Sequence, residues 1–120
     1  MKMEIPVIGF ISPIIGVDGV FNTFRMGRKY GVLKNREQVF LMDEKKKEIF
    51  GTAEVLETSV GKLGELCLQY AGENHTQLFN DQGNYAEDLY RVILKIYGPH
   101  IVNPNKLFTV IKLKRSTIEH

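Results

Sequence analysis

The order of strand-like and helix-like segments constrains the fold of this chain more than any other feature. Runs rich in β-branched and aromatic residues, punctuated by Gly, Pro and Asp, predict strands through the first half of the chain. Two segments with apolar residues at helical spacing follow, and one alternating segment comes last. The predicted strands cover residues 4–10, 20–25, 37–42, 48–57 and 106–114. Because both helices stand together between strands, this order favours a segregated α+β fold over a parallel α/β fold.

The two predicted helices carry different start and stop signals. In the first, four residues recur at helical spacing: Leu63, Leu66, Cys67 and Tyr70. Ser59 is its predicted cap, and Gly72 is predicted to end it in the left-handed conformation. In the second, four residues form one apolar stripe: Leu89, Val92, Ile93 and Ile96. Asn84 and Glu87 resemble a capping box before that stripe, and the Gly-Pro pair at residues 98–99 predicts where the helix stops.

Five short strands in a chain of 120 residues would leave exposed sheet edges unless the sheet curls on itself. We therefore expect a small β-barrel of about five to six strands, with the two helices packed beside it. The length fits a single domain, residues 1–120, with a strand and loop extension at residues 1–19 and a flexible tail at residues 116–120. The polar run at residues 43–47 predicts a hairpin with a charged, solvated tip, which we favour over a phosphate site.

Charge and cysteine content exclude several classes of function. The formal net charge is only +2, so the overall field does not argue for a polyanionic partner. Cys67 is the only cysteine, which excludes an internal disulfide and a cysteine-based metal cage and favours a reducing compartment. Its place among apolar residues at helical spacing predicts a core residue rather than a nucleophile.

Metal, cofactor and membrane signals are weak. The three histidines, His75, His100 and His120, lie far apart and lack ligand-like spacing, so we expect no metal site. The sequence contains no phosphate-binding glycine loop, dinucleotide fingerprint or nucleophile elbow, and we expect no cofactor. Prolines interrupt the apolar stretch at residues 5–17, which is shorter than the ~20 residues of a membrane span. We therefore expect a cytoplasmic protein without a membrane partner.

The densest polar cluster follows the second predicted strand into a Gly-rich turn. It combines an amide, a hydroxyl and three cations: Asn22, Thr23, Arg25, Arg28 and Lys29. Guanidinium groups present planar forks to phosphate or to a base edge, and the lysine adds a point charge. Three aromatic residues interleave the cations, a mixture typical of nucleic-acid surfaces: Phe21, Phe24 and Tyr30. The alternative is that Phe21 and Phe24 belong to the core and the cations form a solvated strand end.

A second polar cluster follows the first predicted helix. It contains a carboxylate, an amide, an imidazole and a hydroxyl: Glu73, Asn74, His75 and Thr76. Loops held by rigid elements often carry function, so these side chains can be aimed into a pocket. Glu73 is a candidate general base or hydrogen-bond acceptor if partial burial raises its proton affinity. Alternatively, Asn74 and His75 only satisfy the free backbone groups at the helix end.

Four short runs, taken in order, resemble the ASCH domains of the PUA-like superfamily. They are Phe-Asn-Thr-Phe-Arg at residues 21–25, Gly-Thr-Ala-Glu-Val at residues 51–55, Glu-Asn at residues 73–74 and Phe-Thr-Val-Ile at residues 108–111. The resemblance spans roughly residues 20–115, most of the chain. Together with Tyr-Gly-Pro-His at residues 97–100, the first run is also similar to small proteins of unknown function carried by bacteriophages and prophages.

The resemblance implies a small β-barrel with helices beside it and an RNA- or nucleoside-binding cleft between them. Some ASCH proteins are amidohydrolases that remove the acetyl group from acetylcytidine with a threonine, a lysine and a glutamate. Thr23 matches the threonine position and Glu73 the glutamate position, whereas Val20 occupies the lysine position. An aliphatic side chain can neither activate a hydroxyl nor stabilise an oxyanion.

We consider three hypotheses for function. The leading one is a PUA-like module that binds RNA, a nucleotide or a modified nucleoside through eight residues: Asn22, Thr23, Arg25, Arg28, Lys29, Glu73, Asn74 and His75. The second is an amidohydrolase acting on acetylcytidine or a similar small amide, with Thr23 as nucleophile and Glu73 as proton carrier. The third is a phage accessory protein that binds a host protein through exposed apolar residues such as Ile14 and Ile15.

Overall fold

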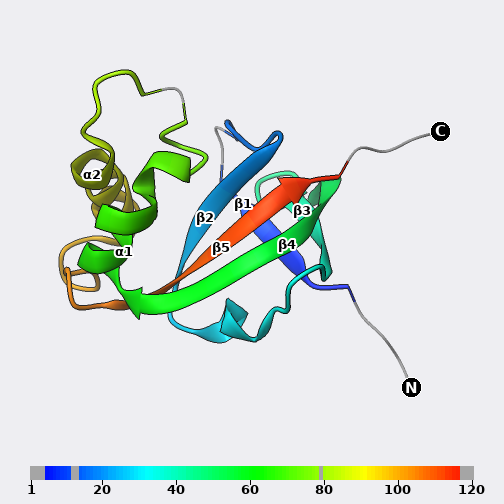
Figure 1. Ribbon diagram of the computed structural model, residues 1–120, viewed down its shortest axis with the longest axis horizontal. Helices are drawn as coiled ribbons and strands as arrows, with labels where there is room; N and C mark the ends of the chain where they lie inside the picture. The colour runs from blue at the N-terminus through cyan, green and yellow to red at the C-terminus, as the bar shows by residue number, and fades with distance from the viewer. Residues whose placement is uncertain (1–4, 12–13, 79, 117–120) are drawn as a thin grey trace.

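The computed structural model, which describes residues 5–11, 14–78 and 80–116, shows a curled sheet with two helices packed beside it (Figure 1). The strands are β1 (Val7–Phe10), β2 (Val20–Met26), β3 (Gln38–Asp43), β4 (Glu48–Lys62) and β5 (Leu107–Arg115). The helices are α1 (Leu63–Tyr70) and α2 (Tyr85–Tyr97), and two 3-10 turns cover Lys29–Val32 and Ala71–Glu73. The expected α+β fold with a small barrel-like sheet is confirmed.

The sheet is mixed, with the strand order β1-β3-β4-β5-β2. β1 runs parallel to β3, and the other neighbouring strands are antiparallel. The register of β4 against β5 shifts between Val55 and Glu57, and such bulges bend and twist a strand. The sheet curls so that β1 and β2 form its two edges, and no strand pairing joins these edges within the described residues. The result is a half-barrel with an open seam between β1 and β2.

Two apolar clusters lie on opposite faces of β2. The first fills the inside of the curl and includes Phe21 and Leu113. The second lies between the sheet and the helices and includes Phe24 and Cys67. Phe21 and Phe24 are three residues apart on one strand, so their side chains point to opposite faces. Both are buried, as is Cys67, so the prediction of a core position for Cys67 and the alternative of core positions for Phe21 and Phe24 are confirmed.

The predicted ends of α1 are wrong. Ser59, its predicted cap, lies within β4 opposite Val110, because the ladder with β5 holds the chain extended through Lys62. No side chain caps α1 at its first residue. Gly72, predicted to end the helix in the left-handed conformation, lies in the 3-10 turn Ala71–Glu73 and has no positive φ.

The predicted end of α2 is correct, and its predicted capping box is not. Gly98 ends the helix with a φ of 88°. Asn84 precedes the first helical residue, as expected, but its side chain makes no capping hydrogen bond. Its backbone carbonyl still accepts the first helical bond, from the amide of Asp88 at 2.9 Å. The amphipathic pattern therefore determines this helix without the reciprocal cap.

The hairpin between β3 and β4 has the predicted charged tip. Asp43 Oδ1 accepts hydrogen bonds from the amides of Lys45 and Lys46 at 2.9 and 3.1 Å, and Lys47 completes the turn with a φ of 58°.

Neither helix in the described part of the chain is long and apolar enough to cross a bilayer. Glu4, Pro13 and the predicted tail beyond Ser116 lie outside the described residues.

Candidate functional site

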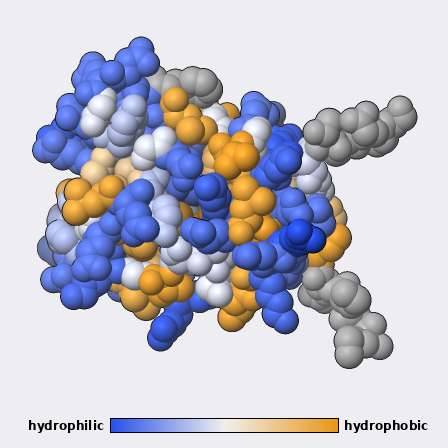
Figure 2. All heavy atoms as spheres, in the orientation of Figure 1, coloured by the Kyte–Doolittle hydropathy of each residue, from blue (hydrophilic) through white to orange (hydrophobic). Residues whose placement is uncertain are grey.

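A cavity of about 590 Å³ lies at the seam of the half-barrel. It is bounded by β1, β2, the loop at residues 74–76 and one face of α2. The lining residues are Gly9, Phe10, Ile11, Ile15, Thr23, Phe24, Arg25, Asn74, His75, Thr76, Leu89, Val92, Ile93, Lys95, Ile96 and Tyr97. We call this space the seam cavity. On the face seen in Figure 2, which shows one side only, hydrophilic residues dominate and apolar residues form separate patches.

Arg25 bridges the two edge strands at the seam cavity. Its Nη1 donates to the backbone carbonyl of Gly9 at 2.5 Å, and its Nε donates to Thr23 Oγ1 at 3.2 Å. The guanidinium carbon lies 4.8 Å from the centre of the Phe10 ring, a cation–π distance. Burial lowers the pKa of Arg25, while Tyr30, Tyr97 and Glu44 oppose that shift.

Arg25 carries more hydrogen-bond donors than the described residues use. A guanidinium has five N–H donors, and the two bonds above use two of them. Within the described residues, no carboxylate lies close enough to form an ion pair with Arg25. A desolvated cation without a carboxylate favours an incoming anion or a strong acceptor.

Two buried asparagines fix the loop that carries His75. Asn22 Nδ2 donates to the carbonyl of Tyr70 at 2.8 Å. Asn74 Nδ2 lies 3.3 Å from both the side-chain and the backbone oxygen of Asn22. The amide of His75 donates to the carbonyl of Asn22 at 3.1 Å, so loop and strand run side by side. Fully buried polar groups that satisfy one another rigidify their surroundings.

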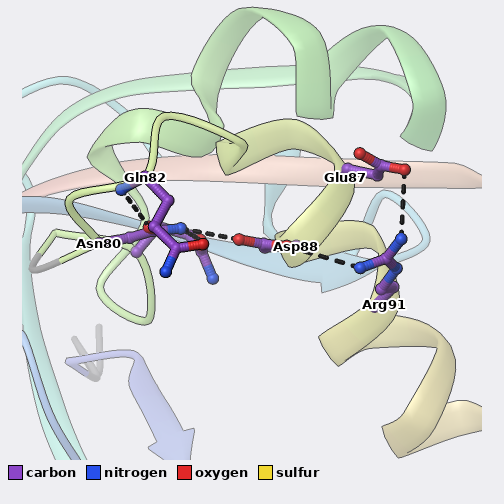
Figure 3. Close-up of polar contacts among 6 residues, drawn as sticks. Asn80, Gln82, Glu87, Asp88 and Arg91 are labelled. Atoms are coloured by element: carbon purple, nitrogen blue, oxygen red, sulfur yellow. Dashed lines mark hydrogen bonds and ion pairs between the residues drawn. The ribbon is translucent and has the colours of Figure 1, made fainter.

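A chain of hydrogen bonds continues from this loop to α2. Asn74 Oδ1 accepts from Thr76 Oγ1 at 2.6 Å, and Gln77 Nε2 donates to the same hydroxyl at 3.3 Å. Asn80 Nδ2 donates to Gln77 Oε1 at 2.8 Å and to Asp88 Oδ2 at 2.9 Å. Figure 3 shows Asn80 reaching from the loop toward Asp88 on the helix. The loop at residues 74–80 is therefore tied both to β2 and to α2.

His75 is held in one tautomer beside the cavity. Its ring packs edge-on against Phe10, with ring centres 5.2 Å apart, and Nδ1 lies 3.1 Å from the carbonyl of Ile15. A carbonyl only accepts, so Nδ1 carries the proton. Burial lowers the pKa of His75 to about 4; the charge of Arg25 adds to this shift and the bond to Ile15 opposes it. The imidazole is neutral at pH 7, with Nε2 as an acceptor.

Four of the predicted site residues line the seam cavity together: Thr23, Arg25, Asn74 and His75. Asn22 is fully buried behind them. The alternative expectation, that Asn74 and His75 only satisfy free backbone groups at the helix end, is wrong: their side chains bond Asn22 on β2 and the carbonyl of Ile15, and Asn22 bonds the carbonyl of Tyr70 at the end of α1. The same contacts that satisfy the backbone place the imidazole at the cavity.

The other predicted site residues lie elsewhere. Glu73 is half exposed and pairs with Lys112 Nζ at 3.6 Å, and it does not line the cavity. Arg28 and Lys29 are exposed at the 3-10 turn that follows β2, and Lys29 Nζ lies 5.6 Å from the Tyr30 ring centre. The three side chains are therefore separate from the group around Arg25.

Sequence reasoning missed the wall that α2 contributes. All four residues of the predicted apolar stripe line the cavity; Leu89 and Ile93 are buried, and Ile96 is 52% exposed. Lys95 adds a second cation to the lining. The stripe has the ordinary i, i+3, i+4, i+7 spacing of a helix packed on a core, so nothing in it indicated a cavity wall. The part of the chain that the structure describes contains no cluster of three His, Cys, Asp or Glu side chains placed to bind a metal.

Comparison with known proteins places the fold and leaves the function open. No family model and no curated protein matches this chain. Protein EF3133 from Enterococcus faecalis V583, described as a member of the family DUF984, matches in its crystal structure with a TM-score of 0.54 and 11% identity. The match covers 85% of this chain and 64% of that one, so the chain spans under two thirds of its neighbour. At this identity the similarity shows a shared fold.

Proposed function

We propose that the chain binds a nucleotide, free or as part of an RNA, in the seam cavity. The observation that carries this proposal is the guanidinium of Arg25, which lines the cavity and has N–H donors that no described residue accepts from. Among the described residues of the lining, only Arg25 and Lys95 are charged, and both are cations. An anionic or acceptor-rich ligand fits that charge.

The size and the walls of the cavity support a ligand of this class. Small-molecule pockets measure about 300–1,000 Å³ and combine apolar walls with a few convergent polar groups. The seam cavity, at about 590 Å³, has this character. Tyr97 adds a partly exposed aromatic ring to the aliphatic residues of α2, and every nucleobase has a face that stacks on such a ring.

Matched arginine variants test the proposal. We expect at least one of AMP, CMP, GMP and UMP to bind at submillimolar concentration in low salt, measured by calorimetry. Arg25→Met should weaken that binding on the order of tenfold or more, because a charged donor is lost from a desolvated site. Arg28→Met removes the same charge from the exposed turn and should change the affinity less than about twofold. Binding by none of the four nucleotides would reject the proposal, as would loss of binding in the Arg28 variant alone.

One observation favours the amidohydrolase as a second candidate. Arg25 Nε donates to Thr23 Oγ1, so a cation stands beside the hydroxyl although Val20 occupies the lysine position. A cation next to a hydroxyl favours the alkoxide that attacks an amide carbonyl. Attack by Thr23 Oγ1 on the carbonyl would break the C–N bond, the departing amine would take up the hydroxyl proton, and water would then hydrolyse the acetyl ester on Thr23 to acetate. Incubation with acetylcytidine followed by chromatography for cytidine tests this candidate. Activity that survives Thr23→Ala would exclude Thr23 as the nucleophile.

We also propose membership of the ASCH family, a phage or prophage context and a cytoplasmic location. The order of the four motif runs and the small α+β half-barrel support the family. A single buried, free thiol at Cys67 suits a reducing compartment. A host-protein partner has less support, because Ile14 packs against the inner core and Ile15 lines the cavity. A tagged protein that recovers no specific host protein would remove that third hypothesis.

A further inference from the structure

Two groups with opposite hydrogen-bonding character face the seam cavity. Arg25 offers donors, and His75 offers an acceptor. Their partners inside the protein account for only part of each side chain, and the unused atoms are the ones available to a ligand.

The unused donors of Arg25 centre on Nη2. Nε and Nη1 are engaged with Thr23 and Gly9, and no described residue accepts a hydrogen bond from Nη2. No unpartnered side-chain nitrogen or oxygen is buried among the described residues, and Arg25 lines the seam cavity, so we infer that Nη2 faces this space. A ligand must therefore bring an acceptor to this atom.

The unused atom of His75 is Nε2. The ring is fixed by the bond from Nδ1 to Ile15 and by edge contacts with Phe10 and Phe21, so Nε2 has a defined direction. It has no hydrogen-bond partner among the described residues and is not buried. Because the imidazole is neutral, Nε2 presents a lone pair. A ligand must bring a donor to this atom.

We propose that His75 determines specificity in the seam cavity, and that a bound nucleotide enters with its base edge, not its phosphate, between Arg25 and His75. This inference rests on the nucleotide-binding function proposed above. A base edge carries acceptors next to N–H donors and so satisfies both side chains. Lys95, which is exposed and belongs to the lining, then meets the phosphate.

A phosphate at the inner end would conflict with His75. Its oxygens are acceptors, and an acceptor held against the lone pair of Nε2 is repelled. Protonation of the ring would remove the conflict, but the buried, Arg25-flanked imidazole resists a second positive charge. The aliphatic wall from α2 also suits a base better than a hydrated dianion.

Fragments of the bound nucleotide test the orientation with wild-type protein. For whichever monophosphate binds best, its nucleoside should retain an affinity within about tenfold, and ribose 5-phosphate should not bind at the same concentrations. The opposite result, with ribose 5-phosphate bound and the nucleoside not, would overturn the orientation and leave nucleotide binding intact. Absence of binding by all four monophosphates would instead reject the proposed function itself, together with this inference.

Two substitutions distinguish the roles of the two ring nitrogens of His75. In His75→Asn the side-chain amide lies near the position of Nδ1 and keeps a donor for the carbonyl of Ile15, but no atom replaces Nε2. The longer side chain of His75→Gln places an amide near Nε2. An unsatisfied donor on the ligand weakens binding by about tenfold or more, so we expect that loss in the Asn variant and a recovery of at least about fivefold in the Gln variant. Equal affinity in all three proteins, with amide spectra that report an intact fold, would refute the role of Nε2.

Discussion

Gly16 lies where the N-terminal loop meets the His75 loop, and replacing it tests whether this contact positions the site. Its φ is +68°, and an added Cβ would stand 2.0 Å from the carbonyl oxygen of His75. Gly19 provides a matched control, because its φ is +63° and an added Cβ would meet nothing within 4 Å. Gly16→Ala and Gly19→Ala therefore share the backbone penalty and differ in the clash.

The magnitudes follow from these two terms. The left-handed conformation costs an alanine about 1–2 kcal/mol, partly offset by the lower entropy of the unfolded chain, so Gly19→Ala should destabilise by about 1 kcal/mol. Gly16→Ala adds a contact about 1 Å shorter than real Cβ atoms show, against backbone that is bonded to Asn22. Overpacking of this kind adds about 1–3 kcal/mol. We expect a difference between the two variants of at least about 1.5 kcal/mol.

Urea unfolding followed by circular dichroism measures both free energies of unfolding. We also expect Gly16→Ala to shift the amide resonance of His75 and to weaken nucleotide binding, and Gly19→Ala to do neither. Equal destabilisation of the two variants would show that the loop carrying His75 moves freely and that its contact with Gly16 does not position the site.

Three further predictions concern titration, the surface ion pair and the thiol. The pKa of His75 is about 4 in the folded protein and ~6.5 in an unfolded chain, so the folded state binds fewer protons between these two pH values. The contribution of His75 to the free energy of unfolding is therefore fully present above about pH 6.5 and is lost as the pH falls toward 4. The free energy of unfolding should drop by up to about 2 kcal/mol between pH 7 and pH 5, and His75→Gln should remove that drop. Glu73→Gln breaks an exposed ion pair with Lys112 and should lower the free energy of unfolding by under about 1 kcal/mol without changing nucleotide affinity. A large loss of affinity would show that Glu73 contributes to the binding site. Cys67, with a thiol pKa of about 11, should react with iodoacetamide at pH 8 only after unfolding, and rapid labelling of native protein would contradict its burial.

Local sequence pattern predicted the elements of this fold well and their ends less well. The spacing of apolar residues reflects which face of an element is buried, every second residue in a strand and every third or fourth in a helix. This spacing therefore predicted where the strands and both helices lie. The prediction that Ser59 caps α1 was wrong because β4 stays paired with β5 as far as Lys62, beyond the segment whose composition predicts a strand. Long-range pairing of this kind is decided by the partner strand, which a local pattern does not contain.

The candidate site was predicted in part, for a similar reason. Thr23 and Arg25 are two residues apart on β2 and so share one face, and His75 follows a helix exit. The sequence therefore predicted these three polar side chains as site residues. The curl of the sheet brings β1 back to β2 and places the Gly9 carbonyl against Arg25. Only this closure distinguishes Arg25 from Arg28, three residues away on an exposed turn. The role of α2 as a cavity wall also depends on where the loop at residues 74–80 anchors it.

The position of the bound nucleotide can be read directly from a crystal structure of the protein with the nucleotide that binds most tightly. We expect ligand density in the seam cavity, with an acceptor of the base within hydrogen-bond distance of Arg25 Nη2 and a donor at His75 Nε2. Density at the exposed cations Arg28 and Lys29, or at the charged hairpin tip, with the seam cavity filled only by water, would contradict this expectation.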